Sequence, residues 1–578
     1  MTTTAYSSML SQLFKQIDVG RENSLNSNCF KKLCTVRILD VVSTQRTRAH
    51  SCEATEAIAL LFGYQAQSSQ CLRHCARGPP RFPRYRTTDN IVFPEYSRAK
   101  KKMKWLFLLL ALAFVSGEET CLSVQEDPYF LFGTKTAYTF ANKDIPTART
   151  HDIPGCQPIA FWLVNRHGSH KPEADEIVEL QKLGDLKNNI VTNYRNGNFR
   201  NTNQRMCSSD LNLLEQWRWD DRHNLTFAGD LTSDGYMTTQ QFAQAWKQRF
   251  PGLMTSSGQN YLFKFVNDQR SSNTFKSFTE GLFGDQAESL DIPRENDEKL
   301  LRPFKFCPAW NKSVEENNDT MSQLNIFESK MEFKEMISNI SLRLGFNYDI
   351  QKEIVLRIYE MCRYNKAWDV SKISPWCAAF TREDLKRLEY AEDLETYYKY
   401  GYGSPMNKDV GCTFVKDMMT FFERHVGNND QPQKPRAMIH LTEAAMLLMT
   451  LTAMGAHQDS APLTGDNYHS AVVQSRKWTT STMTPFNANL AAVLYKCTQN
   501  GNFQVNEEYQ VLFLENERPM NLPGCRVGLC DWSLIKSRYG ELTKNCNLKF
   551  CNSGNNLNGL TGISIAILGF IVSYVIRI

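Results

Sequence analysis

Several features that are missing from this chain already narrow its class. No internal repeat or low-complexity tract interrupts residues 118–553, and no glycine-rich, phosphate-cradling loop of the nucleotide-binding type occurs. An excess of positive charge is also missing from this stretch, which holds 48 Lys and Arg residues against 54 Asp and Glu. The net charge of +5 comes from residues 1–117, where 17 basic residues face seven acidic ones. We therefore expect no nucleic-acid partner.

A short apolar run with the features of a signal peptide lies inside the chain. Residues 103–117 follow a basic stretch, contain an apolar core and end in small residues that are spaced for cleavage. We predict a signal peptide at 103–117, with Met103 as the start of translation and residues 1–102 as an upstream extension that is disordered or not translated. The alternative is a buried helix or a short anchor, although a membrane span needs about 20 apolar residues.

Cysteines and glycosylation sequons both favour export of the chain after residue 117. Twelve of the seventeen cysteines lie between residues 121 and 551, and an even number in an exported chain suggests disulfides whose pairing the sequence leaves open. The spacings of Cys525 with Cys530 and of Cys546 with Cys551 also occur in metal sites, but disulfides fit an exported chain better. We predict no metal and no cofactor. Acceptor sequons occur at Asn224, Asn311, Asn318 and Asn339.

The carboxyl end has the composition of an anchor signal. Asn552, Ser553 and Gly554 are small or polar, and a polar spacer separates them from an apolar run over residues 560–576. The transamidase that attaches a glycosyl-phosphatidylinositol (GPI) anchor reads this order, so we predict residues 554–578 to be an anchor signal. A retained single-pass helix is the alternative, because the spacer is short. Either alternative places the protein in the secretory pathway and on the membrane at the cell surface.

The main part of the chain shows a strand followed by a helix in two places. Its 436 residues are enough for an α/β domain with a sizeable helical companion. The apolar run 158–164 predicts a buried strand that ends just before Arg166, and Pro172 with residues 174–182 predicts a helix. Residues 436–441 likewise predict a strand, and residues 443–454 predict a buried helix that closes at Gly455.

Amphipathic helices are predicted between these two units. In residues 234–249 the residues Met237, Phe242, Ala245 and Trp246 have helical spacing, and residues 379–400 combine paired charges with aromatic side chains. Residues 300–423 are mostly helical in pattern. We expect them to form a cap or second domain beside the α/β part.

A candidate catalytic motif follows the first predicted strand. Residues 166–172 read Arg-His-Gly-Ser-His-Lys-Pro, which is close to Arg-His-Gly-x-Arg-x-Pro, the signature of a histidine that accepts phosphate. Open α/β sheets bind ligands at the carboxyl ends of their strands, where this motif lies. An imidazole can attack phosphorus and form a phosphohistidine, and a guanidinium fork binds two phosphate oxygens. We therefore predict His167 as the nucleophile and Arg166 as a phosphate ligand.

The order of several further motifs identifies a family. The chain from about Cys121 to Cys546 closely resembles the multiple inositol polyphosphate phosphatases, a branch of the histidine acid phosphatases. The motifs are Phe132–Tyr138, Arg166–Pro172, Arg270 with Phe275–Gly284, Ser374–Phe380, Tyr400–Gly403, Pro462–Thr464 with Asn467–Tyr468, Arg476–Trp478, Pro485–Leu490 and Val493–Cys497.

The resemblance implies an α/β fold in which a sheet domain flanked by helices accompanies a second, mainly helical domain. It places the phosphatase domain at residues 118–553, with the α/β part at about 121–215 and 425–545 and the helical part at about 216–424. It also implies hydrolysis of inositol polyphosphates such as phytate, and of 2,3-bisphosphoglycerate, with His167 as nucleophile and Arg166 and Arg270 as phosphate ligands.

Two positions of the family's pattern are changed in this chain. His170 replaces the second arginine of the first motif and cannot make a bidentate fork. The family's later His-Ala-Glu motif falls on Glu443-Ala444-Ala445 when counted without gaps, so a phosphate-contacting histidine becomes Glu443 and the proton-donating glutamate becomes Ala445. Two compensations are open: His440 with Glu443 as the acid if the register slips by three residues, and a His170 that is protonated at acidic pH.

These observations lead to two hypotheses about function. The first is an exported phosphomonoesterase that removes phosphates from inositol polyphosphates through a phosphohistidine. The second is a catalytically impaired pseudophosphatase that binds inositol phosphates or acts in surface interactions, since loss of a general acid costs about 10²–10⁴ in rate. The oligomeric state does not follow from the sequence.

Overall fold

The structure is a computed structural model, and it describes residues 121–124, 127–142, 151–197, 205–427, 434–498 and 507–552. All of these residues belong to one compact unit, Ser116–Ile578. The predicted signal peptide, the upstream extension and the apolar tail lie outside the described residues. Within the described ranges, no helix has both the length and the apolar character that crossing a membrane requires.

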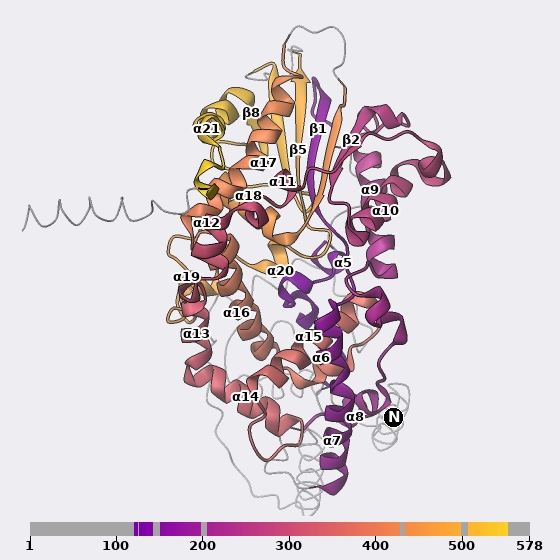
Figure 1. The fold of residues 1–578 in the computed structure, drawn as a ribbon, viewed down its shortest axis with the longest axis vertical. Coiled ribbons are helices and arrows are strands. Elements are labelled where there is room, and N and C mark those ends of the chain that lie inside the picture. Colours follow the sequence, from indigo (N-terminus) through magenta and orange to yellow (C-terminus); the bar gives the residue numbers. More distant parts are fainter. Residues whose placement is uncertain are drawn as a thin grey trace, which may run out of the picture. The chain divides into compact units, whose positions relative to one another are not determined.

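A mixed eight-stranded sheet forms the centre of this unit (Figure 1). Its middle strand, β1, pairs with β4 in parallel and with β5 antiparallel. The strand order is β3-β2-β4-β1-β5-β6-β7, and β8 pairs with β6. The strands are β1 (Cys156–Arg166), β2 (Tyr261–Phe265), β3 (Arg294–Glu295), β4 (Ala437–Thr442), β5 (Asn489–Cys497), β6 (Tyr509–Glu515), β7 (Arg518–Pro519) and β8 (Leu529–Asp531).

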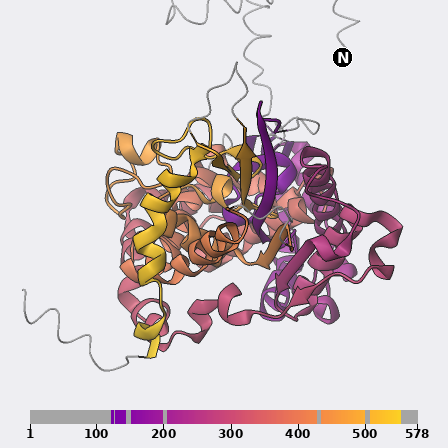
Figure 2. The same cartoon turned by 90° about the horizontal axis from the view of Figure 1, so that it is seen from above.

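Successive side chains of β1 contribute to two different cores, one on each face of the sheet. Phe161 and Leu163 belong to a core with aromatic residues of α9 and α10, whereas Trp162 and Val164 belong to a core with residues of α17, α18 and α21. Figures 1 and 2 show these two groups of helices on opposite sides of the strands. These helices are α9 (Ser233–Arg249), α10 (Gln269–Phe283), α17 (Pro405–Glu423), α18 (Ala444–Met454) and α21 (Trp532–Asn545).

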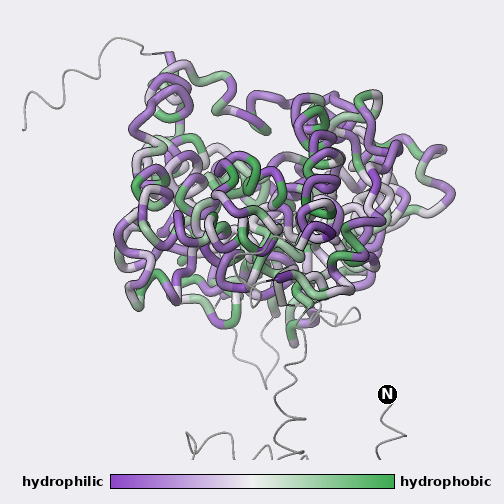
Figure 3. Tube along the Cα trace, turned by 90° about the horizontal axis from the view of Figure 1, so that it is seen from below, coloured by the Kyte–Doolittle hydropathy of each residue, from purple (hydrophilic) through white to green (hydrophobic). Residues whose placement is uncertain are grey.

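Most of the remaining helices form the part of the unit away from the sheet, together with short connecting turns, whereas α11 (Glu298–Leu301) contacts β2 and β4. Figure 3 shows hydrophilic and hydrophobic residues mixed along the helical turns of the unit, as amphipathic helices require. The remaining helices are α5 (Tyr138–Ala141), α6 (Ala174–Gln181), α7 (Leu183–Asn196), α8 (Ser208–Gln216), α11 (Glu298–Leu301), α12 (Pro308–Trp310), α13 (Ser322–Ser329), α14 (Met331–Arg343), α15 (Lys352–Trp368), α16 (Arg382–Tyr400), α19 (Ala471–Gln474) and α20 (Thr480–Met483).

The two predicted strand–helix units are confirmed as β1 with α6 and β4 with α18, and α18 ends at Gly455 in the left-handed conformation. The helix predicted at 234–249 is α9, but Met237 is half exposed, because α9 turns Phe242, Ala243 and Trp246 toward the sheet instead. The range predicted as helical, 216–424, also contains β2 and β3, which extend the sheet beyond β4.

All twelve cysteines of the described unit form disulfides. Cys525 pairs with Cys530, so this spacing belongs to a disulfide and not to a metal site. Six disulfides are typical of proteins that fold in oxidising compartments, which agrees with a secreted or extracellular protein. The other five pairs are Cys121–Cys207, Cys156–Cys497, Cys307–Cys551, Cys362–Cys377 and Cys412–Cys546.

Candidate active site

The predicted nucleophile lies at the carboxyl end of β1, held between two neighbouring strands. The amide of Arg166 donates a hydrogen bond to the carbonyl of Ala488 at 2.8 Å, and the amide of His167 donates to the carbonyl of Thr442 at 3.2 Å. The backbone carbonyl of His167 accepts from the amide of Asn487 at 3.1 Å. The backbone of His167 is therefore fixed by segments on both sides of β1.

Hydrogen bonding determines which ring nitrogen of His167 can attack a substrate. The Nδ1 atom lies 2.9 Å from the carbonyl oxygen of Gly168, which only accepts, so Nδ1 carries the proton. The lone pair of the neutral ring is then on Nε2. Burial lowers the pKa of His167 well below its ordinary value, and the charges of Arg270, His170 and Arg166 lower it further. Burial and the nearby cations thus both favour the neutral imidazole, which has the lone pair that attack requires.

The glycine after the nucleophile permits a close approach between β1 and α9. A Cβ atom on Gly168 would lie 2.6 Å from the carbonyl oxygen of Gly235 in the first turn of α9. Beside this contact, the hydroxyls of Ser169 and Thr232 are 2.6 Å apart, and Thr232 caps the helix by accepting from the amide of Gly235 at 2.9 Å. A larger residue at position 168 would push His167 away from α9.

Arg166 is buried, and its guanidinium group donates to two backbone carbonyl groups. Its Nη1 donates to the carbonyl of Thr484 at 2.7 Å and to the carbonyl of Thr134, and its guanidinium carbon lies 4.7 Å from the centroid of the Phe486 ring. Burial lowers the pKa of Arg166 to about 10, so the side chain stays charged at neutral and acidic pH. Its buried Nε has no hydrogen-bond partner in the structure. Arg166 therefore keeps a donor for a further acceptor.

His170 is buried beside His167. The two ring centroids are 5.0 Å apart, and the ring of Phe486 lies 5.5 Å from that of His170. Burial lowers the pKa of His170 well below its ordinary value, and the nearby charge of Arg270 adds to this effect. The burial and the surrounding cations both oppose a second charge at this position, and the compensation by a His170 that is protonated at acidic pH stays a prediction.

Arg270 lies in the first turn of α10 and extends toward His167 and His170. Two nitrogen atoms of its guanidinium group already have partners. Its Nε donates to the carbonyl of Gly229 at 2.5 Å, and its Nη2 forms an ion pair with Glu173, the residue that caps α6. The Arg270 charge acts on His167 more strongly than any other single charge. A bound phosphate would compete with Glu173 for this guanidinium.

The second changed motif lies on the strand next to the nucleophile. In the parallel pairing of β1 with β4, Arg166 is opposite Thr442, so Glu443 follows β4 at the level of His167. Glu443 is the amino-terminal cap residue of α18, and Ala445 is buried in the first turn of that helix. The position of the missing acid is therefore occupied by a methyl group.

Two basic residues that no sequence motif indicates, Arg302 and Lys305, lie beside the carboxylate of Glu443. The Nε of Arg302 lies 3.1 Å from its Oε1, and the Nζ of Lys305 lies 3.4 Å from the same atom. Both cations come from the segment after α11, which is anchored to β4 by a 2.8 Å hydrogen bond from the Thr442 hydroxyl to the carbonyl of Leu301. No motif in the sequence connects these residues.

The alternative in which His440 takes the catalytic role is wrong. His440 lies within β4, is fully buried, and approaches the carbonyl oxygen of Leu163 at 2.9 Å through Nδ1. Its Nε2 lies 3.1 Å from Oδ2 of Asp417. Both ring nitrogens face acceptors of the core, so His440 has a structural role.

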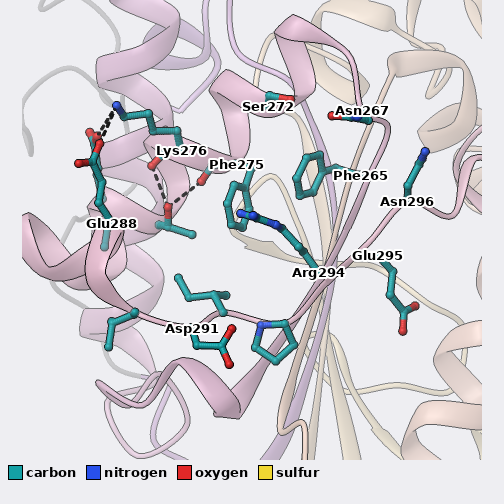
Figure 4. Close-up of a pocket in the computed structure, with 16 residues that line it drawn as sticks. Phe265, Asn267, Ser272, Phe275, Lys276, Glu288, Asp291, Arg294, Glu295 and Asn296 are labelled. Atoms are coloured by element: carbon teal, nitrogen blue, oxygen red, sulfur yellow. Dashed lines mark hydrogen bonds and ion pairs between the residues drawn. The ribbon is translucent and has the colours of Figure 1, made fainter.

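One cavity and one group of potential metal ligands in the described unit are separate from this site. A cavity of about 960 Å³ lies between α10 and β3, with Phe265, Phe275 and Arg294 in its wall (Figure 4). Its lining holds more acidic than basic side chains, which disfavours a polyphosphate. Among the described residues, Cys121, Cys207 and Asp210 are spaced as metal ligands, but the two sulfurs form a disulfide and are not available.

The predicted modification sites lie on the outside or beyond the described part. None of the four sequon asparagines is buried. Of the predicted anchor site, Asn552 is the last described residue, and Ser553 and Gly554 lie outside the described residues.

Comparison with known proteins agrees with this arrangement. The profile of the histidine phosphatase superfamily (branch 2) matches residues 161–510. The chain is 32% identical over 456 residues to multiple inositol polyphosphate phosphatase 1 of Drosophila melanogaster, covering 78% of this chain and 94% of that protein. The human protein of the same name is 27% identical over 440 residues, which cover 72% of this chain and 87% of the human one.

Among solved structures, the phytase from D. castellii superposes with a TM-score of 0.57 at 18% identity, covering 74% of this chain and 88% of the phytase, which is a likeness of fold. The chain belongs to the histidine phosphatase superfamily (branch 2) and, within it, to the multiple inositol polyphosphate phosphatases.

Proposed function

We propose that this protein hydrolyses phosphate monoesters of inositol polyphosphates through a phosphohistidine on His167, with 2,3-bisphosphoglycerate as a further substrate. The observation that carries the proposal is the state of His167, which keeps its proton on Nδ1 and its lone pair on Nε2 at the carboxyl end of β1. Arg166 and Arg270 supply the positive charge that a phosphate group requires at this position. The names of the relatives support the substrate class.

The residues have separate roles in the proposed site. The Nε2 of His167 attacks phosphorus, while Arg166 and Arg270 bind the phosphate oxygens and stabilise the charge of the transition state. His170 contributes a hydrogen-bonding imidazole where the family motif has an arginine. Its Nδ1 donates to the carbonyl of Lys171 at 2.7 Å, which leaves Nε2 as an acceptor when the ring is neutral.

Binding without efficient turnover is the second candidate, and the changed residues favour it. Ala445 cannot donate a proton, and His170 lies in a setting that keeps it neutral. Such a protein would bind an inositol polyphosphate through Arg166 and Arg270 and release phosphate slowly.

The proposed function is tested by trapping the covalent intermediate. The full chain is mixed with inositol hexakisphosphate that is labelled with radioactive phosphorus and quenched within milliseconds in alkali, where phosphohistidine is stable. We expect label on a peptide that contains His167, and release of inorganic phosphate across pH 3–8. Binding of the ligand by calorimetry with neither label nor phosphate release would support the second candidate.

Restoring the missing arginine should strengthen the phosphate site. We expect His170→Arg to raise kcat/KM for inositol hexakisphosphate by about tenfold, because a charged donor to phosphate contributes about 1.5–3 kcal/mol and 1.4 kcal/mol corresponds to a factor of ten. Steady-state phosphate release measures this change. His170→Gln is the control and should give no gain.

Combining His170→Arg with Glu443→His and Ala445→Glu restores the family pattern at all three changed positions. We expect this triple variant to keep at least the kcat of His170→Arg, because Ala445→Glu returns a proton donor to α18 where Glu443→His removes the carboxyl at the end of β4. A triple variant no faster than the unsubstituted chain would contradict the view that these three positions limit turnover.

A further inference from the structure

The proposed reaction needs a proton that the family's usual position cannot supply. When His167 takes the phosphoryl group from an alkyl phosphate, the departing oxygen is strongly basic and must be protonated as the bond breaks. Position 445 carries a methyl group. A donor for this proton therefore has to come from another side chain near His167.

Glu443 is the carboxyl group that the sheet register brings to the nucleophile. The amide of His167 donates to the carbonyl of Thr442, and Glu443 is the next residue along the chain. Its side chain is 28% exposed, so a substrate can reach it. Its charge also acts on the guanidinium of Arg166, one residue before the nucleophile.

The two carboxylate oxygens of Glu443 have different surroundings. Arg302 and Lys305 both approach Oε1, which is buried. The Arg302 contact is an ion pair without a hydrogen bond of acceptable geometry, since Oε1 and the Nε of Arg302 both lack a hydrogen-bond partner. Oε1 is thus the oxygen that the two cations hold, and Oε2 is the oxygen that can carry a proton.

The cations around Glu443 neutralise it only in part. Arg302 also donates to Asp268 at 2.8 Å and lies 3.9 Å from Glu298, so its single charge is shared among three carboxylates. The Lys305 side chain is 48% exposed, which screens its charge by water. Glu443 also interacts electrostatically with Arg166 and with the phenol of Tyr400. A phosphate dianion bound at His167 would bring further negative charge to the side of the site where Glu443 lies.

We propose that Glu443 is the proton donor of this phosphatase and that Arg302 is a positioning residue that holds Oε1 of Glu443 while Oε2 carries the proton. The inference rests on the proposed phosphatase function and deepens it. The family pattern has its acid two residues further along, in the first turn of α18, so this chain would have moved the acid to the end of β4.

The two steps balance with these groups alone. The lone pair of the His167 Nε2 forms the bond to phosphorus, the ester oxygen leaves with the electrons of its bond, and it takes the proton from Oε2 of Glu443. Water then attacks phosphorus and gives its proton back to Glu443 as the nitrogen–phosphorus bond breaks. Inorganic phosphate leaves, and His167 recovers its lone pair.

The dependence on the leaving group tests the proposal. Inositol alkoxides need a proton, whereas p-nitrophenolate leaves without one. We expect Glu443→Gln to lower kcat for inositol hexakisphosphate by about 10²–10³, and kcat for p-nitrophenyl phosphate by less than about fivefold. KM for the inositol substrate should not rise, because the variant removes a negative charge. Equal losses with both substrates, or no loss with the inositol substrate, would overturn the proposal.

Arg302→Gln tests the positioning role. We expect kcat for the inositol ester to fall by about tenfold while hydrolysis of the aryl ester is little changed, and the acidic limb of the pH profile to shift. Glu298→Gln is the matched control, since it removes another carboxylate near Arg302 that is not at the level of His167. It should leave both substrates within about twofold.

The same assays separate a failure of this inference from a failure of the function. If the unsubstituted chain hydrolyses p-nitrophenyl phosphate through His167 but not the inositol ester, the function class stands and no donor operates, which overturns the role of Glu443. If it hydrolyses neither, the proposed function fails and this inference with it.

Discussion

His167→Ala should reduce phosphate release from inositol hexakisphosphate by about 10⁴-fold or more, because no other described group can take over the covalent step. The structure places the Nε2 lone pair of His167 beside two buried or half-buried arginines and an uncharged His170. A water molecule attacking directly would have to replace this nucleophile in a site that is arranged for a fixed imidazole. Steady-state phosphate release measures the loss of turnover, and calorimetry measures separately whether the ligand still binds.

Binding is the control in this experiment. His167→Ala should retain inositol hexakisphosphate affinity within a few-fold, because Arg166 and Arg270 remain. Substantial residual turnover in the variant, at more than about one per cent of the unsubstituted rate, would show that the reaction does not pass through His167.

Asp417→Ala should destabilise the protein by about 3–5 kcal/mol, the usual effect of removing one partner of a buried ion pair. Asp417 accepts hydrogen bonds from the indole of Trp162 at 2.8 Å and the ammonium of Lys264 at 3.2 Å, and it lies 3.1 Å from the imidazole of His440. Without it, the buried Nε2 of His440 faces no acceptor. The free energy of unfolding in urea, measured with the disulfides intact, reports this change.

Lowering the pH should reduce the stability that the interactions of Asp417 provide. Burial opposes the charge of Asp417, but the charge and hydrogen bond of His440, with the charge of Lys264, outweigh it and hold the pKa of Asp417 well below its ordinary value. Because the folded pKa is depressed, this contribution to stability is complete above the unfolded pKa of about 4 and is lost as the pH falls toward the folded value. Below about pH 4, the free energy of unfolding of Asp417→Ala should therefore fall less steeply with pH than that of the unsubstituted protein. Asp417→Asn is the milder control, since it keeps an acceptor.

Local elements of the fold could be predicted because single apolar runs determine them. Residues 158–164 alternate between two cores and need no distant partner to be identified as a buried strand, and β1 appears there. The strands β2 and β3 escaped prediction because they are short and lie between helices, where only pairing with β4 distinguishes them. Register along a sheet is a tertiary property that a local pattern does not contain.

The candidate site could be predicted in part for the same reason. His167 and Arg166 share one short motif, and Arg270 was found through the family resemblance. The contacts that modify them could not be found, since Glu173 and Arg270 are 97 residues apart and Arg302 reaches Glu443 only through the folding of α11 onto β4. The uncharged state of His170 depends on burial, which the surrounding sequence does not reveal.

The cross-links near the carboxyl end determine how a mechanical load would pass through the molecule. Cys551 is joined to Cys307, and Cys546 is joined to Cys412 on α17. Force applied to the chain beyond Asn552 therefore passes through covalent bonds into α17 and the segment after Lys305, and it does not peel α21 away from the sheet turn by turn. A protein held by this end would bear tension on these two cross-links before the hydrogen bonds of α21 were loaded.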